Sequence, residues 1–501
     1  MTAALYTAMP VWVLATSLIT AVVIFTAGEG RQRLRVAMNL LGAVLKVLLV
    51  GVMLGGVAAG HEFTVRLALL PGIEFVLHAD ALTMLFGTLS SVLWLITTIY
   101  AIGYLEQGAN RARFFGFFSL CVAATMGIAL AGNLFTFFVF YEMLTLSTWP
   151  LVVHSGSREA IAAGRTYLRY TLGGSAALLL GIVSLYAFAG PHDFITGGYL
   201  LEEAAFHEPL LLAIFALLIT GMAVKAAMVP LHRWLPGAMV APAPVSALLH
   251  AVAVVKAGAF GIVRVVQDVY GVELVATLQL DTLLAVAASF TIIYGSLRAL
   301  AQTNLKQRLA YSTVSQVSYI ALGMAMGSPL ATVGGLVHLV HQGLMKITLF
   351  FCAGIYGKVR GIHTIDELDG MGRRLPWTTT AFTLGALGMM GVPPLAGFIS
   401  KWHLGLGSVA AGQHWVIGVL LASTALNALY FLPLLHRLWF RSPQDEADTA
   451  PRGGRDREAP PGLLWPTVAT AVGALGAGLF AGVPWSPLAW AEFIVEREYL
   501  P

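Results

Sequence analysis

Apolar runs long enough to cross a lipid bilayer recur from one end of this 501-residue chain to the other. A transmembrane helix needs about 20 predominantly apolar residues, because the hydrocarbon core of a bilayer is about 30 Å thick. Hydrophobic residues make up 58% of the chain and charged residues only 11%, whereas roughly a quarter of the residues in a soluble protein are charged. The sequence therefore predicts an all-α polytopic membrane protein.

Fourteen of these runs are predicted to be transmembrane helices. Their approximate spans are residues 9–28, 34–58, 80–104, 113–131, 133–153, 163–189, 209–231, 242–267, 277–298, 308–326, 329–357, 376–402, 413–440 and 462–482. The intervening segment 62–79, EFTVRLALLPGIEFVLHA, alternates apolar and polar residues around Pro71 and Gly72. This alternation predicts an extracytoplasmic β-hairpin rather than a span.

The distribution of lysine and arginine predicts how the helices are oriented, because cytoplasmic loops carry an excess of positive charge. If the N-terminus lies outside and the helices alternate, 21 of the 29 Lys and Arg residues fall in cytoplasmic loops, and Arg66 and Arg497 fall on the opposite side. Both termini are therefore expected to be extracytoplasmic. The same asymmetry explains the pI near 9.0, so no nucleic-acid partner is expected. The two cysteines lie far apart in apolar segments and predict neither a disulfide framework nor a metal site.

Ionisable residues also fall inside the predicted spans. They are Lys46, Lys225, Lys256, Arg264, Lys346, Lys401, Glu142, His250, His338 and His341. A charge at the centre of a bilayer costs roughly 2.5–3.5 kcal/mol on insertion scales, so such residues normally face a bundle interior or water. Arg264 is close to a helix end and is expected to snorkel to the interface. Lys46 has no evident partner, and its role is left open.

Two interpretations compete for this set. In the first, Glu142 and one lysine form a buried ion pair that only fixes helix packing. In the second, the residues form a proton or cation pathway, for which lysine is suited because burial disfavours its charged form and permits proton exchange near neutral pH. The number of buried lysines and histidines exceeds what packing alone requires. We therefore expect a pathway in which Glu142 close to a lysine holds it charged and separation releases the proton.

Two of the predicted helices are interrupted. The span 209–231 runs into VKAAMVPLHRWLP, with a break at Pro230 after Lys225, and the span 376–402 contains GMMGVPPLAGFISKW, with Lys401 beyond its break. Broken helices are tolerated in lipid where they line a cavity or pack inside protein. They are the seventh and twelfth helices, and a five-helix offset reverses membrane orientation. This predicts two inverted repeats, helices 4–8 and 9–13.

These repeats divide the chain into five parts. Residues 1–112 hold the first three helices and the hairpin, 113–267 the first repeat, 277–440 the second repeat, 441–461 a cytoplasmic loop, and 462–501 the last helix and the tail. The loop sequence RSPQDEADTAPRGGRDREAP is polar and is expected to be a flexible linker.

Histidine and lysine recur between the two breaks. His250 and Lys256 are expected about a turn and a half apart on one helix. His338 and His341 lie at i, i+3 on one face, with Lys346 five residues further on. A histidine pair at this spacing can bind metal, but no third ligand is evident and no metal site is expected. A proton relay is favoured because imidazole titrates near neutrality; the alternative is that each histidine only forms helix-to-helix hydrogen bonds.

Five segments, in this order, make the chain resemble a known family. They are AGNLFTFFVFYEMLTLSTWPL, AVKAAMVPLHRWLPGAMVAPAPVSALLHAVAVVKAG, RLAYSTVSQVSYI, HLVHQGLMKITLFFCAG and GVPPLAGFISKW, within residues 80–440. They are similar to the antiporter-like membrane subunits of respiratory complex I and of Mrp-type multisubunit cation/proton antiporters. The resemblance implies fourteen helices, two inverted five-helix repeats and broken helices seven and twelve.

The resemblance also implies roles for individual residues. Glu142 and Lys225 would be the paired carboxylate and lysine, Lys256 the central lysine and Lys401 the terminal lysine, while His338 and Lys346 fall on the helix that connects the two halves. The size of the chain, with a short tail after the last helix, resembles that of the Mrp D-type subunit, although SALLHAVAVVKAG is closer to the pattern of the largest subunits.

The expected function is proton translocation within a multisubunit sodium/proton antiporter of the Mrp type. The expected partners are other membrane subunits, protons, Na⁺ or another monovalent cation, and the lipid bilayer of a bacterial or archaeal-type plasma membrane. The alternatives are a proton-pumping subunit of a redox-driven complex, such as complex I or a membrane-bound hydrogenase, or of an inorganic-carbon accumulation complex. A stand-alone transporter and a structural scaffold are less well supported. The chain shows no cysteine cluster, no GxGxxG opening a βαβ unit and no haem-ligand pair, so no cofactor and no redox chemistry of its own is expected.

Overall fold

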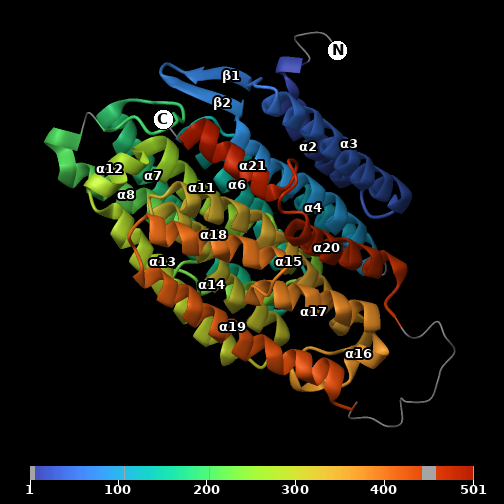
Figure 1. Ribbon diagram of the computed structural model, residues 1–501. Helices are drawn as coiled ribbons and strands as arrows, with labels where there is room; N and C mark the ends of the chain where they lie inside the picture. The colour runs from blue at the N-terminus through green and yellow to red at the C-terminus, as the bar shows by residue number, and fades with distance from the viewer. Residues whose placement is uncertain (1–5, 106–107, 202–203, 443–457, 500–501) are drawn as a thin grey trace.

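The computed structural model describes residues 6–105, 108–201, 204–442 and 458–499. Figure 1 shows most of the helices packed side by side into one bundle, with the two-stranded hairpin at one end. Both ends of the described chain lie at that end: the ring of Tyr6 packs on Phe63 of the hairpin, and Arg497 donates to the Val57 carbonyl at the end of the second long helix. The predicted all-α membrane fold is confirmed, and the predicted hairpin forms the two-stranded sheet of the described residues.

The elements follow one another along the chain with the labels of Figure 1. In the first part they are α2 (Met9–Ala27), α3 (Gln32–Ala58), β1 (Phe63–Leu70), β2 (Ile73–Ala79), α4 (Ala81–Leu105), α5 (Arg111–Ala129), α6 (Leu134–Val152), α7 (Arg158–Ala189), α8 (Ala204–Ala226), α9 (Trp234–Gly237), η1 (Ala238–Val240), α10 (Ala243–Ala251), α11 (Val254–Arg264) and η2 (Val265–Tyr270). In the second part they are α12 (Val272–Thr277), α13 (Leu280–Leu300), α14 (Leu305–Ala325), α15 (Pro329–Arg360), η3 (Asp366–Leu368), α16 (Met371–Arg374), α17 (Pro376–Met390), α18 (Ala396–Ala410), α19 (Trp415–Phe440), α20 (Pro461–Leu479), α21 (Pro487–Ile494) and η5 (Val495–Tyr499).

Twelve helical segments in the described ranges are long and apolar enough to cross a membrane. The other two predicted spans correspond to α14 and to the pair α17 and α18. Helix α14 has 21 residues but is rich in serine and glutamine, while α17 and α18 have 15 residues each and are too short to cross alone. The two inverted repeats remain a prediction.

The predicted hairpin is present, with β1 and β2 paired antiparallel from Phe63 opposite Ala79 to Leu70 opposite Ile73. Gly72 in the turn has φ +79°, a left-handed conformation that glycine adopts without strain. The tight turn therefore falls at the Pro71-Gly72 step that the sequence indicates. The predicted linker 441–461 lies largely outside the described residues.

The chain breaks its helices at three places in the core rather than two. Helix α8 ends at Ala226 before Pro230, and α17 ends at Met390 before a loop that leads into α18 at Ala396. The predicted continuous helix 242–267 is wrong, because α10 ends at Ala251 and α11 begins at Val254. Val252 leaves the helical region with φ −129° and ψ −52°. Neither proline nor glycine marks this third break, so no local signal in the sequence predicts it.

Helix α15 lies at the centre of the bundle, where it packs against α4, α10, α14, α17, α18 and α20. Almost every side chain of α15 from Ala331 to Tyr356 is buried, as is the whole of α11. Helices α7, α13 and α19 instead leave large apolar side chains exposed on the outside, among them Leu180, Phe290 and Leu421. The outer helices therefore carry the apolar surface that lipid requires, and the predicted ionisable residues lie inside.

Candidate functional site

The predicted pathway residues come from six helices and are largely enclosed. Glu142 lies on α6, Lys225 on α8, His250 on α10, Lys256 on α11, His338, His341 and Lys346 on α15, and Lys401 on α18. All except Glu142 and Lys401 are fully buried, and those two are partly buried. Because these helices pack against one another in the core, residues far apart in the sequence are brought into one interior region.

Glu142 and Lys225 are neighbours but form no direct ion pair in the described part of the chain. The Lys225 ammonium donates a hydrogen bond to the backbone carbonyl of Tyr141, the residue before Glu142, and lies 3.3 Å from the centre of the Tyr141 ring. The Glu142 carboxylate accepts a hydrogen bond from Ser175 of α7. The two charges still act on each other electrostatically. The lysine is thus held by a carbonyl dipole and an aromatic face, with the carboxylate held to one side.

Lys256 lies on α11, directly against the helix that carries Lys225. Gly258 makes this close approach, since a Cβ atom built there would lie 2.3 Å from the backbone nitrogen of Ala226. The Lys256 ammonium has no hydrogen-bond partner among the described residues. An unpaired buried ammonium is strongly disfavoured, so this site is suited to a lysine that is neutral or that is met by water.

His250 and Lys346 lie where α10 meets α15, and the break between α10 and α11 separates His250 from Lys256. The expectation that His250 and Lys256 share one helix is therefore wrong. The His250 ring stacks on Phe350 of α15 with ring centres 4.4 Å apart. Lys346 donates to Ser312 and, at 3.0 Å, to the carbonyl of Leu309 on α14. Lys346 also lies within electrostatic range of His250 and Lys256.

His338 and His341 face different surroundings although they are one turn apart. The His338 Nδ1 atom is 2.8 Å from the Ser400 hydroxyl of α18, and its ring lies against Tyr319 of α14. His338 is within electrostatic range of both Lys256 and Lys401. His341 is buried, and its ring lies close to the backbone of Ala396 at the start of α18. No group of three or more His, Cys, Asp or Glu side chains placed to hold a metal occurs among the residues that the structure describes.

Lys401 binds the end of the broken helix that precedes it. Its ammonium donates to the carbonyls of Met389 and Met390 at 3.2 and 2.9 Å and to the Thr424 hydroxyl of α19 at 3.2 Å. These carbonyls have no hydrogen-bond donor within the helix because α17 stops at Met390. The C-terminal end of a helix also attracts a cation. Gly391 caps α17 with φ +86°, and a Cβ atom there would lie 2.9 Å from the Lys401 side chain. The second break therefore provides the carbonyl groups that hold the Lys401 ammonium in place.

Three further polar side chains, from α14 and α15, belong to the same region and were not among the predicted site residues. Gln316 of α14 and Gln342 of α15 are fully buried, and neither has a hydrogen-bond partner in the described part of the chain. Ser312 binds Lys346, as noted above. Buried polar groups without a protein partner normally hold ordered water. The polar stretch STVSQVSY in an otherwise apolar chain was the available signal.

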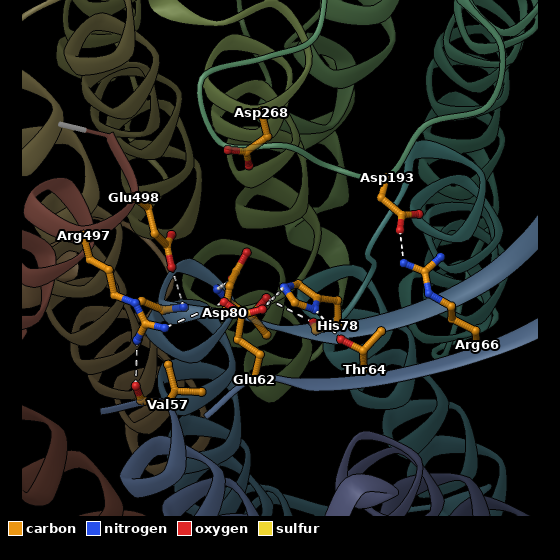
Figure 2. A network of polar contacts seen from close by, with 12 residues as sticks. Val57, Glu62, Thr64, Arg66, His78, Asp80, Asp193, Asp268, Arg497 and Glu498 are labelled. Carbon is orange, nitrogen blue, oxygen red and sulfur yellow. Dashed lines mark hydrogen bonds and ion pairs between the residues drawn. The ribbon is translucent and has the colours of Figure 1, made fainter. Parts of the chain in front are cut away.

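A second polar cluster lies at the hairpin end, around a cavity of about 480 Å³. Arg264 was expected to reach the membrane interface, but it is buried. It forms ion pairs with Asp80 at 2.8 Å and with Asp268 at 2.7 Å. Asp268 lies inside the span that runs to Tyr270, although it was not among the ionisable residues predicted to lie inside the spans. Figure 2 shows Arg497 and Glu498 reaching this cavity from one side and the Arg66–Asp193 pair on the other.

Glu498, near the C-terminus, also belongs to this cluster. Its carboxylate accepts a hydrogen bond of 2.8 Å from the backbone nitrogen of Ala81, next to Asp80. Burial would raise the pKa of Asp80, but the charge and hydrogen bonds of Arg264 lower that pKa below its usual value. Burial and then the charge of Asp80 raise the pKa of Glu498 to about 8. The cluster therefore joins the segment 495–499 to the start of α4 through two carboxyl groups, Asp80 and Glu498, whose pKa values are shifted in opposite directions.

Comparisons with known proteins agree with this architecture. The family model described as "NADH:quinone oxidoreductase/Mrp antiporter, TM" matches residues 131–427. The chain is 35% identical to NADH-quinone oxidoreductase subunit N of Desulforudis audaxviator over 82% of each chain. It is 32% identical to the A/B component of a probable K⁺/H⁺ antiporter of Rhizobium meliloti over 69% of this chain, which corresponds to 34% of that longer protein.

The fold agrees with that of a solved complex. One chain in the structure of the Mrp complex from Dietzia sp. DQ12-45-1b superimposes with a TM-score of 0.86, covering 100% of this chain and 98% of that one at 24% identity. At this identity the match establishes the fold alone. The family match covers more than half of the chain and includes Glu142, both breaks marked by proline and Lys401. The chain is therefore an antiporter-like membrane protein that belongs to the NADH:quinone oxidoreductase/Mrp antiporter transmembrane family.

Proposed function

We propose that this chain is the proton-translocating subunit of a multisubunit monovalent cation/proton antiporter of the Mrp type, similar to the Mrp D-type subunit, in which Na⁺ or K⁺ is the counter-ion. The observation that carries the proposal is the series of largely buried titratable groups that extends from Lys225, just before the first proline-marked break, to Lys401, just after the second. Each member of the series from Lys256 to Lys401 is within hydrogen-bonding or electrostatic range of another. The series lies in the bundle interior and away from the lipid-facing helices.

The proton enters this series at Lys225 and passes to Lys256 across the close contact of α8 with α11 at Gly258. It continues through the region of His250, Lys346, His341 and His338 and reaches Lys401. Proton transfer requires a connected chain of donors and acceptors, and the unpartnered polar atoms of Gln316 and Gln342 are positioned to order water along it.

Glu142 controls the first step by its distance from Lys225. With the carboxylate held by Ser175, the lysine has a carbonyl and an aromatic face as its partners. Movement of the carboxylate toward Lys225 would favour the ammonium form, and its return to Ser175 would favour release of the proton. The switch therefore needs only a small displacement of one side chain between two partners.

A second candidate is a proton-pumping subunit of a redox-driven complex. It is favoured by the 35% identity to an NADH-quinone oxidoreductase subunit N over most of both chains. The same lysine and histidine series would then carry protons, with electron transfer in a partner protein supplying the energy. The two candidates share the pathway and differ in the driving reaction.

The test uses membrane vesicles that contain the native assembled complex, with a pH-sensitive dye to follow proton movement. An imposed Na⁺ or K⁺ gradient is expected to drive proton movement in the wild type and to fail in Lys256→Met. Lys358→Met, which removes an exposed lysine at the end of α15, is the matched control and should retain transport. Proton movement that does not depend on the imposed cation gradient and requires an electron donor would support the second candidate. Wild-type transport by Lys256→Met would contradict the pathway itself.

A further inference from the structure

Lys46 is a fully buried lysine that takes no part in the proposed pathway. It lies midway along α3, and α3 packs against α2, α4 and α5 rather than against the helices of the lysine and histidine series. It also lies outside residues 131–427, which the family model matches. A charge at this depth is expensive, so its presence calls for a local explanation.

The immediate surroundings of Lys46 are polar but contain no counter-charge. Its ammonium donates a hydrogen bond of 2.6 Å to the Ser17 hydroxyl of α2 and lies 4.7 Å from the centre of the Trp94 ring of α4. No carboxylate forms an ion pair with it among the residues that the structure describes. The indole nitrogen of Trp94 is buried and has no hydrogen-bond partner in the same ranges. The Lys46 ammonium and the Trp94 indole nitrogen are thus two buried donors with hydrogen-bonding capacity left over. Buried polar groups of this kind commonly bind ordered water.

The buried face of α3 changes character at Lys46. On the side toward the start of α3 it presents Arg35 and Asn39, and on the side toward the hairpin it presents Val50, Met53 and Val57. These positions are separated by three, four or seven residues, so they form one stripe along the helix. Between Asn39 and Lys46 the stripe holds only the small residues Gly42 and Ala43, and the Thr20 hydroxyl of α2 lies over Gly42. Beyond Lys46 the stripe is apolar.

Neighbouring helices extend the polar half of this stripe. Ser119 of α5 donates to the Asn39 side chain at 3.4 Å, and Thr20 of α2 donates to the Met38 carbonyl at 3.3 Å. Arg35 donates to the carbonyls of Gly28 and Glu29, and its second terminal nitrogen has no hydrogen-bond partner in the described residues. Polar groups thus run from the loop before α3 to the centre of the helix. Beyond Lys46 this polar half has no counterpart on the buried face of α3.

We propose that Lys46 is a proton-binding site that water reaches from the Arg35 end of α3 and that is closed toward the hairpin end. The Lys46 amine takes a proton from a hydronium ion, leaving water, and returns it along the same path. The dead end means that the site binds protons without passing them across the membrane. From the distribution of positive charge the Arg35 end is expected to face the cytoplasm.

The site is placed to influence the central pathway. Only the protonated form of Lys46 makes the cation–π contact with Trp94, which belongs to α4. Helix α4 in turn packs against α10 and α15, the helices of His250 and Lys346, and Tyr100 of α4 donates to the Phe351 carbonyl of α15 at 2.9 Å. Protonation of Lys46 therefore strengthens the contact of α3 with α4, the helix that borders the proposed proton path.

Water access is tested by cysteine labelling in the assembled complex. The background variant carries Cys121→Ser and Cys352→Ser, since both native cysteines are buried and free. Asn39→Cys and Met53→Cys are then compared, because both are buried on the same face of α3, seven residues before and after Lys46. A membrane-impermeant maleimide should label residue 39 from the Arg35 side alone and leave residue 53 unlabelled from either side. Equal labelling of the two positions, labelling of neither, or labelling from the hairpin side would overturn the proposal.

Proton binding is tested separately by the pH profile of transport. Lys46→Gln and Lys46→Arg both remove titration, the first as a neutral and the second as a permanently charged side chain. Both variants are expected to lose one inflection in the dependence of transport on the pH of the Arg35 side, and the two should differ in rate at high pH. Wild-type profiles in both would contradict a proton-binding role, and failure of Lys46→Gln to assemble would leave Lys46→Arg and the labelling result to decide.

Discussion

The Lys225 ammonium donates a hydrogen bond to the backbone carbonyl of Tyr141 and lies 3.3 Å from the centre of its ring. The carboxylate of the next residue, Glu142, points to Ser175 instead of to the lysine. The acid and the base that the family resemblance pairs are thus adjacent yet held apart by different partners. Ser175 and Lys225 thus compete for the Glu142 carboxylate. This competition is predicted to set the proton affinity of Lys225, the first lysine of the pathway.

Ser175→Ala is expected to release Glu142 toward Lys225. The closer carboxylate would stabilise the ammonium, so a higher pH would be needed to remove the proton. A charge-assisted hydrogen bond contributes about 1.5–3 kcal/mol, and a shift of one pH unit corresponds to about 1.4 kcal/mol. The alkaline shift in the pH profile of transport should therefore be about one to two units. Ser184→Ala on the same helix is the control, and an unshifted Ser175→Ala profile would remove Ser175 from the switch.

Gly258→Ala is expected to separate α8 from α11. The added Cβ would lie 2.3 Å from the Ala226 nitrogen and 2.6 Å from the Met222 carbonyl oxygen, and backbone atoms cannot move aside as a side chain can. Overpacking of this kind costs about 1–3 kcal/mol. A lower thermal unfolding temperature and slower transport should appear together. Gly173→Ala on α7, where a Cβ meets no atom within 4 Å, should leave both unchanged.

Gly391→Ala tests the seat of Lys401. Both Gly391 and Gly412 have positive φ angles, +86° and +69°, so alanine at either should cost about 1–2 kcal/mol in backbone strain. Of these two positions, only Gly391 places the new Cβ against the Lys401 side chain. Thermal unfolding should show a similar loss of stability for both variants, whereas transport should fall in Gly391→Ala alone. Equal transport in the two variants would show that the position of Lys401 is not critical.

The docking of the C-terminal segment 495–499 is expected to depend on pH through Glu498. Its pKa of about 8 in the folded protein lies above the usual value of a glutamate, so the docked segment binds more protons than the free one between about pH 4.3 and 8. Docking should therefore weaken as pH rises through this range. Asp80 has the opposite shift, and its contribution is lost only in acid.

Hydrogen exchange of residues 487–499 measures this dependence in the assembled complex. Protection should fall as pH rises toward the Glu498 pKa of about 8 in the wild type. In Glu498→Gln it should stay constant, because glutamine can still accept from the Ala81 nitrogen and does not titrate there. A Glu498→Gln profile with the same pH dependence as the wild type would assign the effect to another group.

Much of the fold could be predicted from the sequence because apolar length and proline are local signals. The spans, the hairpin around Pro71-Gly72 and the breaks near Pro230 and before Ala396 all follow from a few adjacent residues. The break between α10 and α11 could not be predicted in this way, since Val252 and Ala253 carry no helix-breaking chemistry. Tertiary packing determines it.

The burial of the ionisable residues was predictable from the sequence, but their contacts were not. Burial of Lys225 and Lys256 follows from the apolar helices around them. The contact of Arg264 with Asp80 joins residues 184 positions apart, and that of Lys46 with Ser17 joins α3 to α2. Such partners depend on which helices become neighbours, which no short stretch of sequence encodes. The expectation that Arg264 snorkels was wrong for this reason.

We propose above that protons cross the bundle through Lys225 under the control of Glu142. The most direct test is the initial rate of proton translocation by the purified complex in vesicles, measured for Lys225→Ala and Glu142→Gln at wild-type expression and assembly. Each rate is predicted to fall at least about tenfold, because each loss removes a group worth more than about 1.4 kcal/mol to the proton-transfer step. Rates equal to the wild type in both variants would contradict the claim.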